Sequence, residues 1–388
     1  MTTATFSTQR VDPYNPPAEL ARLQREDPVS RVPWRDGFIW AVTKHADVRT
    51  VLGDARFSSD RSLPGHPMNA GYTSAAKLKN LIEMDPPDHT RQRVRVMGEF
   101  TVKKIAGMRP RIEQIVESAI DDMLASGDAA DLVTALSLPV PSVVIAELLG
   151  VPYEDHDFFQ VNSATFVEID TSMEQKLEAM GNLRTYIAGL VEARMENPGD
   201  DILSRQLAAG AGAEELTGLG FLLLIAGHET TANMISLSIA TLLDKPELLE
   251  QLREGPDLIP GAVEELLRYF TIADVGHQRL ATADIEVGGE LIRTGEAVYA
   301  FGHVANRDPD VFDDPNRIDF TRGARNHVAF GFGPHQCLGQ NLARLELEVV
   351  LEAVIRRIPT LRLAVPFGEI PFKEHGPNYG VYSLPVAW

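Results

Sequence analysis

Apolar residues recur every three or four positions through most of the chain after about residue 90, and this period predicts helices. Strand-like alternation is rare and comes mostly late in the chain. The pattern therefore predicts a mainly α-helical fold with a minor β region. The predicted helical segments are residues 112–127, 143–151, 173–195, 216–243, 262–270 and 338–358.

The few predicted strands are short. Residues 38–54 predict a strand followed by a helix, and residues 284–300 predict strands joined by a turn at two consecutive glycines. Residues 360–366 predict a last strand. The turn-rich residues 61–72 predict a long loop, and such loops often line binding sites.

Length and composition are those of a globular protein with a large core. The 388 residues are 44% hydrophobic and 23% charged, and no repeat or low-complexity tract divides them, so we expect one domain over residues 1–388. The single cysteine excludes an internal disulfide. The chain begins without the features of a signal peptide, and its most apolar run, residues 216–226, is shorter than the roughly 18 residues of a membrane span. We therefore expect a cytoplasmic protein with no membrane partner.

The only cysteine, Cys337, lies in the glycine-rich sequence "FGFGPHQCLG", directly before a predicted helix. A lone cysteine is most often a small buried hydrophobic residue, and loop glycines often supply only turn geometry. Here Phe330 and Gly333 lie seven and four residues before the cysteine, and Gly339 lies two residues after it. At the glycine and phenylalanine content of this chain, that spacing arises by chance about twice in ten thousand. The loop resembles the haem-thiolate signature Phe-x-x-Gly-x-x-x-Cys-x-Gly of the cytochrome P-450 superfamily.

The chemistry of a thiolate ligand explains each position of this loop. A cysteine at a helix N-terminus, here near Leu338, has its negative charge stabilised by backbone N–H groups and the helix dipole. Glycines let the backbone approach a flat macrocycle, and a bulky residue at position 339 would block it. The resemblance implies haem b held noncovalently, with Cys337 as the axial iron ligand. Covalent attachment through Cys-x-x-Cys-His would require a second cysteine.

Upstream of this loop, "EELLR" places Glu265 and Arg268 one turn apart on a predicted helix. Three other Glu-x-x-Arg pairs occur in the chain, so the spacing alone is weak. Its position before the cysteine loop matches the structural Glu-x-x-Arg pair of the family. The resemblance implies Arg317 as the third member of this structural group, although "DPNRIDF" departs from the common Pro-Glu-Arg-Phe form.

The sequence "AGHETT", residues 226–231, interrupts a long apolar helix with an acid, a glycine and two threonines. Glu229 and Thr230 could lie at an exposed edge of that helix. Local breaks in helix propensity and apolar pattern, however, often mark functional sites. The segment resembles the family's oxygen-binding groove, which implies that Glu229 and Thr230 are catalytic and deliver protons to dioxygen. The fold implied is that of the cytochromes P-450, with haem between this long helix and the helix after the cysteine.

Four basic residues match contacts that the family makes to the haem propionates. In "DPPDHTRQRVR", His89 and Arg93 lie four residues apart on one face of a helix, which by itself is typical of a solvated basic surface. Arg279 and His335 match two further propionate contacts. Charge-assisted hydrogen bonds from these four side chains would balance two buried carboxylates.

The resemblance implies a monooxygenase that activates dioxygen with external electrons and hydroxylates or epoxidises a lipophilic small molecule, such as a secondary metabolite, sterol-like compound or xenobiotic. No Gly-x-Gly-x-x-Gly sequence occurs, so the expected electron donors are a ferredoxin and its NAD(P)H-dependent reductase. Residues 91–111 carry seven basic residues and one acid in a chain of net charge −19. They form either a docking patch for an acidic ferredoxin or ion pairs with surplus carboxylates. The net charge argues against a nucleic acid partner.

Two other functions stay open on the sequence alone. A non-oxygenating haem-thiolate enzyme, such as a peroxygenase or isomerase, would not need the acid and alcohol of "AGHETT". A haem sensor would not need an interior proton relay and would carry an effector module, which the sequence does not show. The motifs most resemble soluble bacterial members of the superfamily, especially those of actinomycetes.

Overall fold

The computed structural model divides into two compact units, each discontinuous in sequence. The first comprises Met1–Arg91, Pro260–Gln340 and Phe372–Gly380, and the second comprises Gln92–Ile259, Asn341–Pro371 and Val381–Trp388. One domain over residues 1–388 stays a prediction. The structure describes residues 10, 12–34, 37–68, 80–152, 155, 158–159, 161–162, 165, 171–273, 277–373 and 378–388.

Short strands and short helices make up the first unit. One helix, α12, starts at Ile259, which belongs to the second unit, and continues into the first. The elements in chain order are α1 (Ala18–Glu26), β1 (Val29–Trp34), β2 (Gly37–Val42), α2 (His45–Gly53), β3 (Phe57–Ser58), η2 (Leu81–Glu83), α12 (Ile259–Phe270), β5 (Gln278–Ala281), β6 (Ile285–Val287), β7 (Glu290–Ile292), β8 (Ala297–Ala300), α13 (Gly302–Ala305) and η7 (Gly333–His335).

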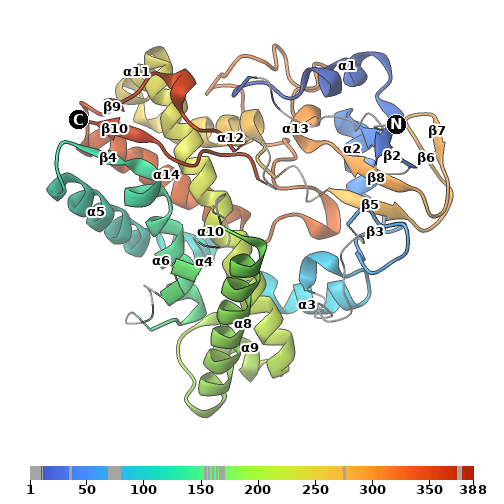
Figure 1. Ribbon diagram of the computed structural model, residues 1–388, viewed down its shortest axis with the longest axis horizontal. Coiled ribbons are helices and arrows are strands. Elements are labelled where there is room, and N and C mark those ends of the chain that lie inside the picture. Colours follow the sequence, from blue (N-terminus) through green and yellow to red (C-terminus); the bar gives the residue numbers. More distant parts are fainter. Residues whose placement is uncertain are drawn as a thin grey trace. The chain divides into compact units, whose positions relative to one another are not determined.

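A five-stranded sheet in the order β1-β2-β8-β5-β3 forms the core of this unit (Figure 1). The pair β2 and β8 is parallel, with Trp40 opposite Val298, and the other pairs are antiparallel. A separate hairpin joins β6 to β7 at Gly288 and Gly289, whose φ angles of +57° and +86° favour glycine. The predicted turn is thereby confirmed. The pattern missed β1 because Pro33 interrupts its apolar alternation.

Helices dominate the second unit, as the apolar period predicts. A three-stranded sheet in the order β4-β10-β9 accompanies them. The elements in chain order are α3 (Asp88–Met97), which starts in the first unit, η3 (Gly98–Phe100), α4 (Val102–Ala106), α5 (Arg109–Ala125), β4 (Ala129–Asp131), η4 (Val133–Ser137), α6 (Pro139–Leu149), α8 (Met173–Glu196), α9 (Ile202–Ala208), α10 (Ala213–Asp244), α11 (Pro246–Glu254), η6 (Pro256–Leu258), α14 (Gln340–Arg357), which starts at the end of the first unit, β9 (Arg362–Leu363), η8 (Phe367–Glu369) and β10 (Pro385–Ala387).

The 32-residue helix α10 is the centre of this unit and packs against α6 and α8 (Figure 1). Its side chains are buried on every side from Thr231 to Leu242, which explains why this stretch carries no charged residue. All six predicted helical segments are confirmed, as α5, α6, α8, α10, α12 and α14. Among the described residues, no helix has both the length and the apolar character to span a membrane.

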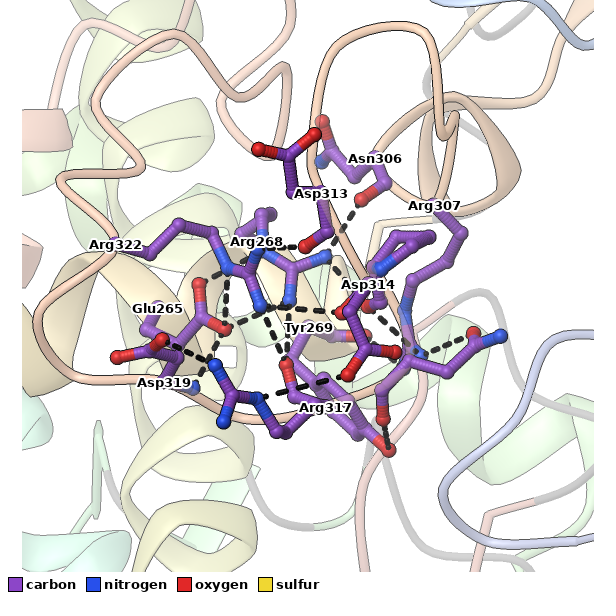
Figure 2. A network of polar contacts seen from close by, with 12 residues as sticks. Glu265, Arg268, Tyr269, Asn306, Arg307, Asp313, Asp314, Arg317, Asp319 and Arg322 are labelled. Carbon is purple, nitrogen blue, oxygen red and sulfur yellow. Dashed lines mark hydrogen bonds and ion pairs between the residues drawn. The ribbon is translucent and has the colours of Figure 1, made fainter.

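In the first unit, a buried ion pair ties α12 to irregular backbone that follows α13 (Figure 2). Arg268 has no exposed surface, and its Nε and Nη2 each donate a 2.8 Å hydrogen bond to one oxygen of Glu265. Its Nη1 donates to the carbonyls of Asn306 and Pro315 at 2.8 and 2.9 Å. The guanidinium therefore fixes the path of the main chain as well as one carboxylate.

Arg322 supplies the third charged side chain beside Glu265 and Arg268 (Figure 2). The prediction that the side chain of Arg317 is the third member of this group is therefore wrong. Arg322 Nε donates to Glu265 Oε1 at 3.0 Å, and its side chain is 10% exposed. The guanidinium of Arg317 is 67% exposed, because it pairs with Asp314 and Asp319 on either side of it in sequence. Arg317 contributes its backbone carbonyl, which accepts a bond from the buried guanidinium.

A separate buried acid lies between helices of the second unit. Glu346 on α14 is 2% exposed, and its carboxyl group makes a hydrogen bond with the side chain of Thr231 on α10. Burial raises the pKa of Glu346 to about 8, although the bond to Thr231 opposes this shift. The side chain is therefore mostly a neutral carboxylic acid at pH 7.

Replacing the buried cation of the ion pair should cost far more stability than replacing an exposed one. We expect Arg268→Met to lower the free energy of unfolding by about 3–5 kcal/mol, because it leaves Glu265 buried without its partner. Arg317→Met is the matched control, and its exposed pairs should be worth less than about 1 kcal/mol. Urea unfolding of both variants checks this, and equal losses would contradict the assignment.

The stability contribution of Glu346 should depend on pH. Its pKa is higher in the folded than in the unfolded chain, so the folded state binds more protons and loses stability as pH rises from about 4.5 to about 8. Glu346→Gln removes this dependence, and the variant should gain up to a few kcal/mol relative to the parent between about pH 5 and about pH 8.5. Urea unfolding at both pH values measures the difference.

The control for this measurement is Glu352→Gln, on the same helix but with a side chain that is 41% exposed and paired with Arg109. That variant should show no comparable gain at high pH. A stability difference between Glu346→Gln and the parent that does not change with pH would show that the acid is not protonated in the folded chain.

Candidate functional site

Three backbone hydrogen bonds shape the loop that carries Cys337. Its own N–H donates to the carbonyl of Phe330 at 2.8 Å, which closes the loop on itself. Within it, Gly331 N–H donates to Val328 at 2.9 Å and Gln336 N–H donates to Gly333 at 3.0 Å. Cys337 is exposed, unlike most cysteines, and α14 begins three residues later, at Gln340 rather than near Leu338.

Two glycines of the loop have clear geometric reasons. Gly333 has a φ of +71°, and a Cβ there would lie 2.7 Å from the carbonyl oxygen of Leu52 and 2.9 Å from Cα of Gly53. The loop therefore rests on the end of α2, where no side chain fits. At Gly339, by contrast, a Cβ would have no described atom within 4 Å. A side chain at 339 would enter open space beside the cysteine loop.

Two predicted binding residues from distant parts of the chain meet in the first unit. The ring centroids of His89 on α3 and His335 in η7 lie 4.0 Å apart, with their planes at 34°. His89 is 1% exposed, and His335 is half-buried two residues before Cys337. Arg93 follows His89 one turn later on α3 and is half-buried. The structure thus brings His335 and His89 together next to the cysteine loop.

Arg279 on β5 is a buried cation of the same unit. Burial lowers the pKa of Arg279 to about 10, Asp85 opposes that shift, and the positive charge of Arg61 adds to it. The pKa of His66 falls to about 4, because of burial first and then the charges of Arg61 and Arg279. A buried guanidinium whose charge is disfavoured by burial and by a neighbouring cation favours an anionic ligand.

Glu229 and Thr230 lie within α10 in the second unit. Glu229 is 9% exposed, and Thr230 is half-buried, with its hydroxyl donating to the carbonyl of Ala226 at 2.7 Å. Burial raises the pKa of Tyr382, and the nearby charge of Glu229 raises it further. Glu229 therefore does not lie at an exposed helix edge, whereas the Thr230 hydroxyl and its partner Ala226 lie on an exposed part of the helix.

Sequence reasoning missed several residues that the structure brings into these sites. His66 and Arg61 belong to the loop that the sequence predicts over residues 61–72, but no pattern indicates that the charge of Arg279, more than 200 residues later, acts on His66. Glu346 does carry a signal, since it lies on the helix face that Leu342 and Val350 make apolar. Among the described residues, no group of three His, Cys, Asp or Glu side chains could hold a metal ion.

Comparison with known proteins identifies the family. The family profile described as Cytochrome P450 matches residues 190–383. The chain is 49% identical to the vitamin D3 dihydroxylase of Streptomyces griseolus, over 99% of this chain and 96% of the relative. It is 46% identical to the pentalenic acid synthase of Streptomyces avermitilis, over 99% of this chain and 97% of that one.

Solved structures agree with this assignment over the whole fold. The crystal structure of cytochrome P450 MoxA from Nonomuraea recticatena matches with a TM-score of 0.94 and 49% identity, covering 99% of this chain and 98% of the other. The crystal structure of GfsF matches with a TM-score of 0.94 and 43% identity, covering all of both chains. The chain therefore belongs to the cytochrome P450 family and is a haem-dependent monooxygenase with the fold that its cysteine loop predicted.

Proposed function

We propose that Cys337 would hold a noncovalent haem b through its thiolate, and that the enzyme hydroxylates or epoxidises a lipophilic small molecule. The observation that carries this proposal is the loop itself. It presents the chain's only cysteine at the surface of the first unit, held through its own backbone N–H. The start of α14 three residues later places the sulfur near the positive end of a helix dipole, which favours a thiolate.

The residues around the loop fit a flat macrocycle with two carboxylates. The open space at Gly339 leaves room beside the cysteine, and the buried guanidinium of Arg279 suits an anion. We assign the propionate contacts to His89, Arg93, Arg279 and His335, of which His89 and His335 already lie side by side. When bound, haem with a thiolate ligand supplies dioxygen binding and cleavage of the O–O bond.

Cys337→Ser tests the ligand assignment directly. The variant should fold but lose the thiolate-type band in the carbon monoxide difference spectrum of the reduced protein, because a serine hydroxyl does not replace a thiolate at the iron. If the thiolate-type band persists in Cys337→Ser, the proposal fails.

Gly339→Leu is a second variant for the same test. Its side chain meets open space in the protein, so the stability of the chain without haem should change little. Haem content after expression and reconstitution should fall by at least about tenfold, because the leucine occupies the space that we assign to the macrocycle. Full haem content would show that the macrocycle does not lie beside position 339.

Glu229 and Thr230 are the groups that we propose to handle protons during the reaction. Glu229 is buried within α10, and the hydroxyl of Thr230 can accept a hydrogen bond while it donates one to Ala226. An acid next to an alcohol can pass a proton along, and residues 216–243 of this helix carry no other acid.

Thr230→Ala should uncouple the reaction. We expect product per reductant consumed to fall by at least about tenfold, with hydrogen peroxide replacing it, because the hydroxyl that relays the proton is gone. Thr230→Ser keeps a hydroxyl and serves as the control. Product, peroxide and reductant measured together check this, and an unchanged ratio in Thr230→Ala would refute the relay.

A medium or large lipophilic substrate is our proposal for the substrate class. Named relatives include a vitamin D3 dihydroxylase, a pentalenic acid synthase and a 20-oxo-5-O-mycaminosyltylactone 23-monooxygenase. The sequence-based candidates for the pocket walls include residues around 61–82, 158–180, 272–275 and 377–381. Parts of each of these segments lie outside the described residues, so they stay predictions.

A ferredoxin with its NAD(P)H-dependent reductase is our proposal for the electron donor. The basic segment offers a narrower docking patch than its composition predicts, because most of its cations form ion pairs. The paired cations and their acids are Arg91 with Asp88, Arg95 with Glu215, Lys104 with Glu99, Arg109 with Glu113, Glu348 and Glu352, and Arg111 with Glu147.

The location of the protein in the cytoplasm stays a prediction. The action of both units as one catalytic domain also stays a prediction.

A further inference from the structure

The acid that precedes Glu265 on α12 makes its own contact with the chain before the cysteine loop. Glu264 Oε2 lies 3.1 Å from Nε2 of His327, and the two side chains are 10% and 1% exposed. Consecutive side chains of a helix point about 100° apart, so the two acids of α12 reach different segments. Glu265 holds the network around Arg268, whereas Glu264 contacts the side chain of His327, a residue of the chain that leads to Cys337.

A second hydrogen bond fixes which nitrogen of this imidazole carries the hydrogen. The N–H of Ala329 donates to Nδ1 of His327 at 3.1 Å. A backbone N–H can only donate, so Nδ1 is the unprotonated nitrogen. Nε2 then carries the hydrogen and donates it to Glu264. The imidazole of His327 therefore connects Glu264 on α12 to the backbone N–H of Ala329.

The N–H that His327 holds lies where the cysteine loop begins. The preceding N–H, of Val328, donates to Asn306 Oδ1 at 2.8 Å, so side chains hold two consecutive backbone N–H groups. The next residue is Phe330, whose carbonyl accepts the N–H of Cys337 at 2.8 Å. Any displacement of residues 328–330 would therefore move the carbonyl that holds the cysteine.

We propose that Glu264 and His327 form a positioning pair that keeps the cysteine loop in the shape a thiolate ligand needs. This inference rests on the proposed role of Cys337. The pair acts through the backbone of residues 328–330 rather than on the iron. The properties of a haem-thiolate centre depend on the orientation of the sulfur and on its hydrogen bonds. The pair affects these properties indirectly, because it holds the backbone to which Cys337 is bonded.

Two conservative substitutions of His327 separate its two bonds. The side-chain oxygen of asparagine can take the place of Nδ1 and accept from Ala329, whereas the longer glutamine can place its NH2 group near Nε2 and donate to Glu264. His327→Leu removes both bonds. In the pair, Glu264 orients the imidazole and the imidazole holds the loop backbone, so His327→Asn, which keeps the bond to Ala329, should disturb the loop less than His327→Gln and His327→Leu, which lose it.

Hydrogen exchange of the holoenzyme measures the loop directly. In His327→Leu and His327→Gln, backbone N–H groups of residues 328–337 should exchange at least about tenfold faster, because their supporting bond is lost. His327→Asn should stay within about threefold of the parent. Val32→Ala, a core truncation in β1 of the same unit, is the control that destabilises the unit, because Val32 belongs to a hydrophobic cluster that contains no residue of 328–337.

A spectroscopic readout accompanies the exchange measurement. The share of reduced protein that shows the thiolate-type carbon monoxide band should fall in His327→Leu and His327→Gln and should stay close to the parent level in His327→Asn and Val32→Ala. A general loss of stability would lower all four alike, so the pattern across variants distinguishes positioning from folding.

The inference is overturned if His327→Leu leaves the exchange of residues 328–337 unchanged, or if His327→Asn and His327→Gln behave alike. The two proposals fail separately. A thiolate-type band in Cys337→Ser refutes the role of Cys337 whatever the loop does. Loss of that band in Cys337→Ser, together with unchanged exchange in His327→Leu, refutes only the positioning pair.

Discussion

The ion pair between Glu265 and Arg268 constrains the irregular half of the first unit. Taking a guanidinium fully out of water costs several kcal/mol, so every donor of Arg268 must find an acceptor inside the protein. The carboxylate supplies two acceptors and the main chain supplies the rest, at Asn306, Pro315 and Arg317. Because these acceptors are backbone carbonyls, the hydrogen bonds of Arg268 determine the path of the backbone in a segment that forms no strand or helix.

The cysteine loop inherits its position from three neighbours within the same unit. The end of α2 meets Gly333 so closely that only glycine fits there, Asn306 holds the N–H of Val328, and His327 holds the next one. Asn306 also belongs to the network of Arg268, to which it offers its carbonyl. The exposed cysteine thus stands on a rigid base although it lies in a loop, and rigidity of this kind is what a metal ligand requires.

The sequence predicted the parts of this protein whose cause is local. Helical period depends on neighbours within a few residues, so each of the six segments that were predicted to be helical is a helix. The spacing around Cys337 identified the family. Choosing Arg322 over Arg317 depends on the path of the backbone, which brings one guanidinium inward and leaves the other beside two acids. The effect of the Arg279 charge on His66 depends on the sheet that holds Arg279. Strand β1 depends on its pairing with β2.

The parallel pairing of β2 with β8 has a consequence for how the chain is made. At about 5 to 20 residues per second, the roughly 250 residues between these strands take on the order of 10 to 50 seconds to synthesise. Through that interval β2 has only β1 beside it, and its other edge has no native neighbour. The sheet nearest the start of the chain is therefore among the last parts of the protein to close, and the nascent chain depends on protection of that edge from other chains until β8 is made.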